Sequence, residues 1–441
     1  MSPDLAFARS QMALSLAFHI VFAAVGVGMP VLMVVAEGLH LRTREPVYLD
    51  LAKRWAGGTA ILFAVGAVSG TVLSFELGLL WPGFMAFAGG VIGLPFSLEG
   101  FAFFAEAIFL GIYLYGWDRV SAVAHWLAGV GVSVSGMLSA IFVVTVNAWM
   151  NAPTGFEMAG GRIVRIDPLA AMMNPASLNQ VVHMVLAAYV ATAFIAAGVH
   201  AFFLLRDHHD VFHRRGLGIA LALASVSTPL QAVSGDALAR MVAIRQPAKL
   251  AAMEGHYRTE AGAPLVIGGI PDDAAMTTRY AIRIPRGLSL LAHHDPHAVV
   301  RGLDSIPRDE WPNTRIVHWA FDLMAGAGFV MLAVVGWSGW LWWRRRRLPD
   351  DRWLLRALVV TGPLGLVAIE AGWIVTEVGR QPWIIQGVMR TSEAVTPMPG
   401  LIVPFVTFTL VYVFLSVILV YLLRRQFLAT EPARREVDRG R

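Results

Sequence analysis

Cysteine is absent from this chain of 441 residues. Disulfide bonds, thiolate metal sites and a heme attached through a Cys-x-x-Cys-His motif are therefore excluded, and any metal would need His, Met or carboxylate ligands. Charged residues are also scarce, at 15% of the chain, whereas about a quarter of a soluble domain is charged. The hydrophobic share is 56% and the mean hydropathy is +0.61. This balance predicts a membrane protein.

Nine apolar segments are long enough to cross a bilayer, whose core of roughly 30 Å needs about 20 residues of helix. We therefore predict an all-α fold, a polytopic membrane bundle of about nine transmembrane helices. Residues 1–236 hold the first six spans, 237–316 form a long outer loop, 317–423 hold the last three spans, and 424–441 form a tail. The predicted spans are 12–38, 55–79, 94–116, 124–147, 179–205, 216–236, 317–343, 353–376 and 399–423.

Basic residues gather at the ends of the spans that share one side when the helices alternate in direction. The positive-inside rule makes that side cytoplasmic, which places the N-terminus outside and the C-terminus inside. The same placement accounts for the net charge of +5 without a nucleic-acid partner. The residues concerned are Arg42, Arg44, Lys53, Arg54, Arg119, Arg206, Arg214, Arg215, Arg344 to Arg347, Arg352, Arg424 and Arg425.

The outer loop of about 80 residues between the sixth and seventh spans is longer than ordinary helix connections. Long loops of this kind often carry function, although a merely packed or disordered loop is the alternative.

Two carboxylates, Glu99 and Glu106, lie in the third predicted span. Each costs roughly 2.5–3.5 kcal/mol on insertion scales when placed near the middle of a membrane helix. Seven residues of helix turn through about 700° and rise by about 10 Å, so both side chains share one face. This spacing favours a proton path or a cofactor pocket, and the alternative is a packed carboxylate bonded to a neighbouring helix.

Three potential iron ligands lie in other spans: His19 in the first, His183 in the fifth and Met324 in the seventh. A lone membrane histidine is more often a packing residue, and a lone methionine usually fills core space. With the orientation above, however, His183 and Met324 reach similar depths below the outer surface. His and Met on facing helices form a six-coordinate, low-spin heme site suited to electron transfer.

The eighth span closes at the same outer level with Glu377 and Arg380, and Trp373 lies on the same helical face as Glu377. His19 and Glu99 also fall in the outer halves of their helices. The candidate ligands therefore gather in one leaflet, which scattered structural polar residues would not be expected to do.

At these positions the sequence closely resembles subunit I of the cytochrome bd quinol oxidases, over nearly the whole chain. The most specific match is GRQPW at Gly379 to Trp383, within EAGWIVTEVGRQPW. Further matches are SLAFHI around His19, LEGFAFFAE around Glu99 and Glu106, GWDR at Gly116 to Arg119, QPAKLAAMEG in the outer loop, and FDLMAGAGF around Met324.

The resemblance implies three hemes: a low-spin heme b, a high-spin heme b and heme d. His183 and Met324 would ligate the low-spin heme, while His19 and Glu377 would each ligate one high-spin heme, in either order. Glu99 would be a ligand or proton donor at the oxygen-reactive pair. Trp373 and Arg380 would lie around the hemes, with Arg380 offsetting propionate or carboxylate charge.

The resemblance also implies a quinol site in the outer loop at Lys249 and Glu254. Glu254 could accept a quinol proton and Lys249 could donate to a quinone oxygen, although a solvated charge pair is the plain alternative. Quinol would release protons outside while dioxygen is reduced with protons from the cytoplasm. Glu106, with Ser139 on the fourth span, is the candidate for that inward proton supply.

Members of the family work in the bacterial inner membrane with a second membrane subunit, and additional small subunits are left open. The sequence leaves ubiquinol or menaquinol, heme occupancy and cyanide sensitivity undecided. Asp322 stands where some relatives carry Arg, which would alter the electrostatics of the low-spin heme. The competing interpretations are another membrane heme protein without oxygen chemistry and a proton-coupled transporter that uses the buried carboxylates.

Overall fold

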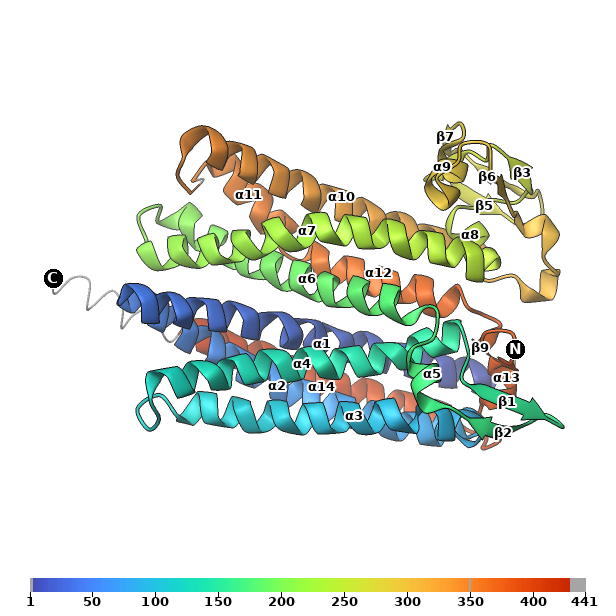
Figure 1. The fold of residues 1–441 in the computed structure, drawn as a ribbon, viewed down its shortest axis with the longest axis horizontal. Coiled ribbons are helices and arrows are strands. Elements are labelled where there is room, and N and C mark those ends of the chain that lie inside the picture. Colours follow the sequence, from blue (N-terminus) through green and yellow to red (C-terminus); the bar gives the residue numbers. More distant parts are fainter. Residues whose placement is uncertain (1–2, 349, 429–441) are drawn as a thin grey trace. The chain divides into compact units, whose positions relative to one another are not determined.

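The protein is mostly helical in the computed structural model, which describes residues 3–348 and 350–428 (Figure 1). Within these residues nine helical segments are long and apolar enough to cross a membrane. They are α1 (Pro3–Thr43), α2 (Pro46–Leu80), α3 (Pro82–Tyr115), α4 (Ala122–Asn151), α6 (Ser177–Arg206), α7 (Val211–Arg245), α10 (Thr314–Arg345), the pair α11 (Arg352–Thr361) and α12 (Leu364–Val378), and α14 (Ile402–Leu428).

These helices confirm all nine predicted spans, but several are longer than predicted: α1 and α2 each begin nine residues earlier and α3 begins twelve residues earlier. The sixth span was expected to end at residue 236, but α7 continues to Arg245, so the first nine residues of the predicted loop are helical. Neither Gly nor Pro stands between Asp236 and Pro247, and Asp236 forms an ion pair of 2.9 Å with Arg240 one turn later. The predicted tail begins within α14, and its residues 429–441 lie outside the described part of the chain.

The eighth span is divided at Gly362 and Pro363, since proline cannot supply the amide proton that a continuous helix needs. Here the helix backbone lies against α6: a Cβ atom on Gly198 would be 3.1 Å from the Cα of Gly362. Small residues let membrane helices approach this closely.

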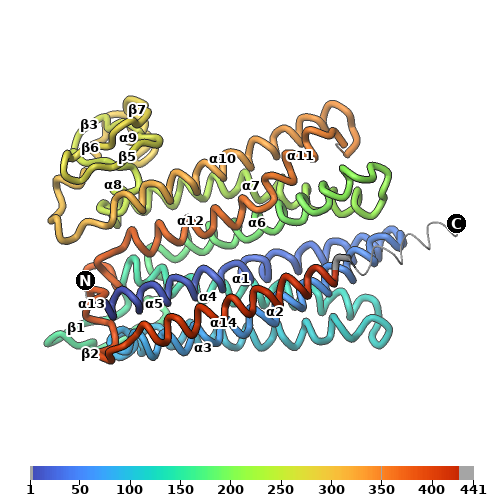
Figure 2. The backbone as a smooth tube through the Cα atoms, turned by 180° about the vertical axis from the view of Figure 1, so that it is seen from behind, coloured from blue at the N-terminus to red at the C-terminus, as the bar shows by residue number. Residues whose placement is uncertain are grey.

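The chain forms two compact units. The first contains the residues up to Met85, Phe101–Leu138 and the chain from Val395 onward; the second contains Ala86–Gly100 and Ser139–Ala394. In the first unit α14 packs against both α1 and α2, as the tube through the backbone shows (Figure 2). In the second unit α12 packs against α6 and α10, and α7 contacts α6 and α10.

Outside the spans, the second unit carries short helices and two-stranded antiparallel sheets rather than unstructured loops. The helices are α5 (Pro168–Met172), α8 (Pro247–Met253), α9 (Gly287–His293) and α13 (Thr391–Ala394). The strand pairs are β1 (Phe156–Ala159) with β2 (Arg162–Ile166), β3 (Glu260–Ala261) with β8 (Val299–Val300), β4 (Leu265–Ile267) with β7 (Ile282–Ile284), β5 (Ile270–Asp272) with β6 (Thr277–Arg279), and β9 (Trp383–Ile385) with β10 (Met389–Arg390).

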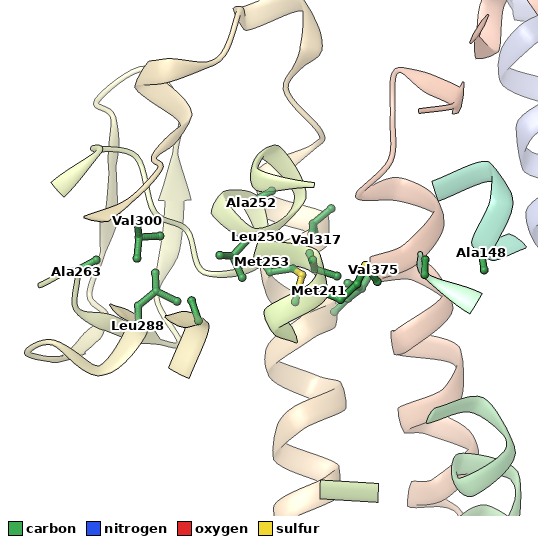
Figure 3. Close-up of a cluster of buried hydrophobic side chains, with 14 residues drawn as sticks. Ala148, Met241, Leu250, Ala252, Met253, Ala263, Leu288, Val300, Val317 and Val375 are labelled. Atoms are coloured by element: carbon green, nitrogen blue, oxygen red, sulfur yellow. The ribbon is translucent and has the colours of Figure 1, made fainter. Parts of the chain in front are cut away.

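A hydrophobic core anchors the outer loop to the helix ends (Figure 3). Leu250 and Met253 of α8 pack with Met241 of α7, Val317 of α10 and Val375 of α12, while Leu288 and Val300 extend the cluster through the loop. Burial of such side chains contributes about 1.5–3 kcal/mol each relative to exposure. The loop is therefore a folded part of the second unit, and α8 holds a fixed position over the ends of the spans.

Candidate functional site

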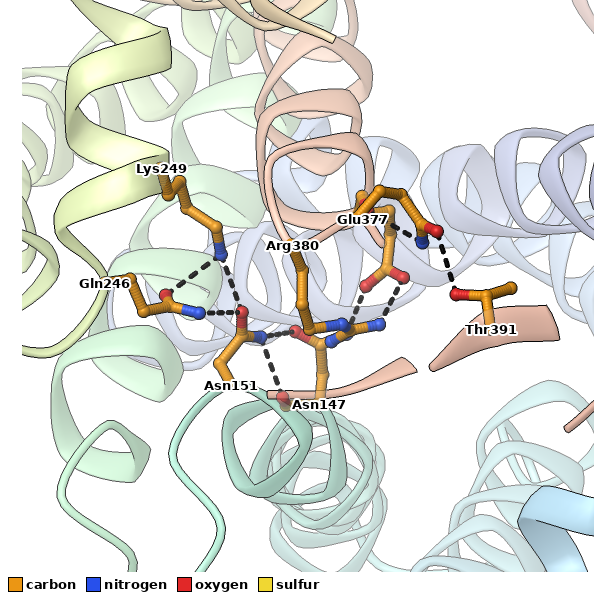
Figure 4. A network of polar contacts seen from close by, with 8 residues as sticks. Asn147, Asn151, Gln246, Lys249, Glu377, Arg380 and Thr391 are labelled. Atoms are coloured by element: carbon orange, nitrogen blue, oxygen red, sulfur yellow. Dashed lines mark hydrogen bonds and ion pairs between the residues drawn. The ribbon is translucent and has the colours of Figure 1, made fainter. Parts of the chain in front are cut away.

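A network of polar side chains joins the ends of α4 and α12 in the second unit (Figure 4). One carboxylate oxygen of Glu377 accepts a hydrogen bond of 2.6 Å from the Asn147 amide, and the other accepts one of 2.6 Å from Arg380 Nη2. Both donors orient the carboxylate, as the partners of a metal-binding carboxylate usually do. The network thus presents Glu377, predicted as an iron ligand, in a fixed orientation.

Arg380 is 2% exposed, and its Nε and Nη1 atoms have no hydrogen-bond partner within residues 3–348 and 350–428. A buried guanidinium with free N–H groups is costly unless an acceptor is supplied. Arg380 therefore suits a second anionic group beside Glu377, such as a heme propionate, which it can bind through two N–H groups.

Lys249 lies on the other side of the same network and is 4% exposed. Its ammonium donates to Asn151 Oδ1 at 2.6 Å and to Gln246 Oε1 at 2.9 Å. Burial, aided by the positive charge of Arg380, lowers the pKa of Lys249 to about 7. Near neutral pH this side chain can therefore both give up and take up a proton.

Gly379, the first residue of the GRQPW segment, permits this arrangement. A Cβ atom at this position would lie 2.9 Å from Cγ of Lys249 and would clash with the Val375 carbonyl oxygen. The glycine thus allows the lysine stem to pass the end of α12.

A partly open cavity of about 190 Å³ borders this network. Lys249 and Arg380 line it together with Gln246, Arg301, Glu310 and Trp383. The cavity connects the two buried cations to the outer loop.

Glu254 follows α8 directly and is also 4% exposed. Its Oε2 atom has no hydrogen-bond partner. Burial raises the pKa of Glu254 to about 8, and the negative charge of Asp322 acts in the same direction. Lys249 and Glu254 are therefore two separately buried groups rather than the solvated charge pair that was the alternative.

His318 of α10 fixes the turn that carries Glu254. Its Nδ1 lies 2.7 Å from the Met253 carbonyl oxygen, and its Nε2 lies 3.0 Å from the Gly268 carbonyl oxygen and 3.5 Å from a carboxylate oxygen of Asp322. The same carboxylate accepts the Gly268 backbone N–H at 2.8 Å. Two residues of one helix thereby hold both ends of the segment from α8 to β4.

His183 of α6 faces α7, where Ser234 Oγ lies 3.0 Å from its Nδ1 and the Gln231 amide nitrogen lies 3.1 Å from its Nε2. If the amide donates, Nε2 carries the lone pair and Nδ1–H points at the serine. This is the tautomer that an iron ligand requires.

Met324 of α10 lies against α12, where a Cβ atom on Gly372 would be 3.0 Å from its sulfur. His183 and Met324 thus belong to helices of one bundle, α6, α7, α10 and α12. Gly372 leaves the space that the thioether occupies.

His19 of α1 lies beside α2 in the first unit. Its Nδ1 is 3.0 Å from Ser69 Oγ, and a Cβ atom on Gly70 would lie 3.0 Å from its Cε1. A histidine held through one ring nitrogen by a hydroxyl can present the other nitrogen to a metal.

The two carboxylates of α3 have different partners. Ser139 donates a hydrogen bond of 3.1 Å to Glu99, whereas Glu106, 7% exposed, lies against Gly136. Ser139 thus contacts Glu99, while Gly136, three residues earlier on α4, lies beside Glu106. The inward proton supply expected from Glu106 with Ser139 stays a prediction.

Trp373 lies on α12 one turn before Glu377, as predicted, and its indole Nε1 has no hydrogen-bond partner. Among the described residues, no group of three or more His, Cys, Asp or Glu side chains could hold a free metal ion. One or two protein ligands per iron suit heme, because the porphyrin supplies the remaining donors.

Comparison with known proteins shows which family the chain belongs to. The family model for cytochrome bd terminal oxidase subunit I matches residues 7–431. The chain belongs to this family. As a member of a cytochrome family it is a heme-binding integral membrane protein.

Relatives of this cytochrome bd subunit span nearly its whole length. A putative cytochrome bd menaquinol oxidase subunit I of Bacillus subtilis is 40% identical over 96% of both chains. A cytochrome bd ubiquinol oxidase subunit 1 of the same organism is 31% identical over 99% of both chains. The solved bd oxidase structure from Geobacillus thermodenitrificans is 40% identical, with a TM-score of 0.90 over 97% of this chain and 99% of that chain.

Several residues of the site were not found from the sequence. Asn147, Asn151 and Gln246 complete the network, Gln231 and Ser234 hold His183, and His318 holds the Glu254 turn. Polar residues near helix ends are common, so only the prediction that α4 ends beside α12 could have singled out the two asparagines.

Proposed function

We propose that this chain is the catalytic subunit of a bacterial quinol oxidase, which oxidises quinol at the outer face and reduces dioxygen to water. Family membership over residues 7–431 carries the proposal, and the buried Lys249, Glu254 and Arg380, with the partly exposed Glu377, support it. The transporter alternative explains Glu99 and Glu106 alone and has no relative in its favour.

Three hemes would be held by the residues predicted above: a low-spin heme b by His183 and Met324, and a high-spin heme b and heme d by His19 and Glu377, in either order. The surroundings of these residues fit heme ligation. His183, His19 and Glu377 each have a hydrogen-bond partner, and Met324 lies against a glycine. When bound, the hemes would supply electron transfer and oxygen chemistry. Arg380 would neutralise a propionate, and the Trp373 indole N–H would donate to a neighbouring acceptor.

Quinol would bind at the Glu254 turn. Glu254, when ionised, can accept a hydroxyl proton from quinol, and its position in a low-dielectric site favours uptake of that proton. Lys249, with a pKa of about 7, can donate a hydrogen bond to a quinone oxygen and pass protons to the Asn151 and Gln246 network. The cavity beside Lys249 offers those protons a route to the outer solution.

The oxygen-reducing side would draw its protons from the cytoplasm. Glu106 and then Glu99, with the Ser139 hydroxyl on its carboxylate, would supply them along one face of α3. Because release and uptake fall on opposite sides, a proton gradient would build without a pump. The N-terminus would be periplasmic and the C-terminus cytoplasmic, as the basic helix ends indicate.

The functional unit would be a complex in the cell inner membrane with a second membrane subunit of the oxidase. Ubiquinol and menaquinol both remain possible substrates, because relatives named for each share more than 30% identity with this chain.

A reduced-minus-oxidised optical spectrum of membranes containing this chain and its partner tests the proposal. Bands of b-type heme together with a chlorin band in the far red are expected. No heme absorbance from assembled protein would contradict the proposal, and b heme without the chlorin band would contradict the assignment of heme d.

A further inference from the structure

Among the residues that the structure describes, four buried polar atoms without hydrogen-bond partners meet in the first unit, on side chains that the candidate site does not use. They are Gln11 Oε1 and Ser15 Oγ on α1, Glu76 Oε2 on α2 and Tyr412 Oη on α14. None of these side chains is more than 3% exposed. Buried polar atoms are nearly always satisfied, by protein or by ordered water, so four orphans in one place require a common explanation.

Direct contacts show that the four belong to one cluster. The Gln11 amide donates to the other carboxylate oxygen, Oε1, of Glu76 at 2.9 Å. The Ser15 hydroxyl faces both Glu76 and Tyr412. Three helices that pack on one another, α1, α2 and α14, thus direct oxygen atoms at one point.

The chemistry of the four atoms selects their ligand. Gln11 Oε1 can accept a hydrogen bond but cannot donate one, and the same holds for Glu76 Oε2 while the carboxylate is ionised. The two hydroxyl groups can both donate and accept. A water molecule meets this set, because it donates twice and accepts twice, and buried waters typically make about three such bonds. A divalent cation does not, since the cluster has a single carboxylate.

The cluster lies on the same helix faces as His19. On α1, Gln11, Ser15 and His19 are spaced by four residues and therefore share one face, with Ser15 one turn, about 6 Å, from His19. On α2, Glu76 is seven residues, about 10 Å, from Ser69, whose hydroxyl bonds the His19 ring. A polar strip therefore leads from Glu76 to the histidine.

Within the described residues of α2 and α14, no other charged residue stands near Glu76 that would fix its protonation. Glu76 is the only charged residue in the last 26 residues of α2, and α14 has none before Arg424. On the outer part of α1, Asp4 accepts the backbone N–H groups of Gly400 and Leu401. Arg9 is two residues from Gln11 and so points about 200° away around the helix.

We propose that Gln11, Ser15, Glu76 and Tyr412 hold an internal water molecule. Glu76 exchanges a proton through this water when the heme site at His19 gains or loses an electron. When one electron is added beside His19, the Glu76 carboxylate takes up one proton from the bulk solution, relayed by the internal water molecule; when the electron leaves, the proton returns to the bulk solution. The inference rests on the proposed function, because it takes His19 as a heme ligand. One added charge at a separation of about 10 Å, the rise along α2 from Ser69 to Glu76, would shift a proton equilibrium by roughly tenfold in an effective dielectric of about 20.

Redox-difference infrared spectroscopy on the assembled two-subunit oxidase tests the inference. We expect a carboxyl C=O band that appears on reduction, shifts in D₂O and is absent in Glu76→Gln. Tyr412→Phe and Ser15→Ala should keep the band but move its frequency, because each removes one partner of the water. Glu76→Asp retains the acid and should retain a shifted band, which guards against a Glu76→Gln variant that fails to assemble.

The outcomes separate this inference from the proposed function. If Glu76→Gln keeps every heme band and every carboxyl difference band, the proton exchange is refuted while the oxidase assignment stands. If the band depends on replacing Na⁺ by K⁺, the site holds a monovalent cation and the water is refuted. The heme content of the His19→Ala variant tests the proposed function and not the proton exchange. Retention of all heme in that variant would overturn the proposed role of His19 as a heme ligand.

Discussion

The amide of Asn147 donates a hydrogen bond of 2.6 Å to the carboxylate of Glu377, which joins the ends of α4 and α12 across 230 residues of sequence. Arg380 engages the second oxygen of the same carboxylate. An anion that is both a proposed iron ligand and a partner in two short hydrogen bonds has little freedom to rotate.

Replacing Asn147 by Ala should therefore weaken the heme that Glu377 is proposed to hold. Loss of a partner that orients a ligand usually lowers metal affinity or activity by 10–100-fold. Heme content per protein and the high-spin absorption bands measure this effect. Full heme content with unaltered bands would show that Glu377 does not depend on Asn147 for binding.

Met324→Leu should remove the low-spin heme signal selectively, because leucine keeps the volume but offers no thioether. The reduced-minus-oxidised spectrum measures the loss. Met331→Leu is the matched control: it lies on the same helix and is 3% exposed, yet it is not a proposed ligand. Equal spectra for the two variants would remove Met324 from the heme site.

Quinol oxidation should show a bell-shaped pH profile. Glu254 must be ionised to accept a proton, so its pKa of about 8 makes the rate rise with pH up to that value. Lys249 loses its charge as pH rises through about 7, which lowers the rate on the alkaline side. The optimum should therefore fall between these two values in steady-state kcat/KM measurements.

Two variants test which residue causes the acid side and which the alkaline side of that pH profile. Glu254→Gln should lower kcat/KM for quinol by about 10²–10⁴-fold while the heme bands persist. Lys249→Arg keeps its charge at high pH and should flatten the alkaline limb, with a lower maximum because the guanidinium does not fit the ammonium site. An unchanged alkaline limb would assign it to another group.

His318→Ala should loosen the outer loop without disturbing the spans. The substitution removes the ring whose nitrogens lie 2.7 Å and 3.0 Å from the Met253 and Gly268 carbonyl oxygens, and a buried carbonyl that loses its N–H donor costs about 1–3 kcal/mol. Limited proteolysis of the segment between α8 and α10 should then proceed faster, and KM for quinol should rise. Wild-type resistance to proteolysis would show that the hydrophobic core alone holds the loop.

Gly379→Ala should destabilise the site by about 1–3 kcal/mol, because the added methyl group meets the Lys249 stem and the Val375 carbonyl. Thermal release of heme is the measurement. Gly93→Ala is the control, since a Cβ atom there has nothing within 4 Å. Equal thermal stability for both variants would contradict the proposed close approach.

Sequence periodicity and length were sufficient to locate the nine helices, because a bilayer imposes one long apolar run per span. They could not foresee that α7 would continue to Arg245 or that residues 260–300 would pair into short strands, since these depend on packing against α10 and α8. Lys249 and Glu254 could be named from resemblance, but their burial could not: it arises from contacts with Asn151, Gln246 and the Asp322 region, distant in sequence.

The helix α10 begins beneath the outer loop and holds that loop through His318, six residues before Met324. Six residues of helix span about 9 Å, and this interval is a property of the backbone rather than of any side chain. With quinol at the proposed site in this loop and Met324 as the proposed ligand of its first electron acceptor, the loop could change its sequence to accept a different quinone headgroup while the spacing from donor to acceptor stays constant. The proposal thus lets substrate choice and electron-transfer rate evolve independently.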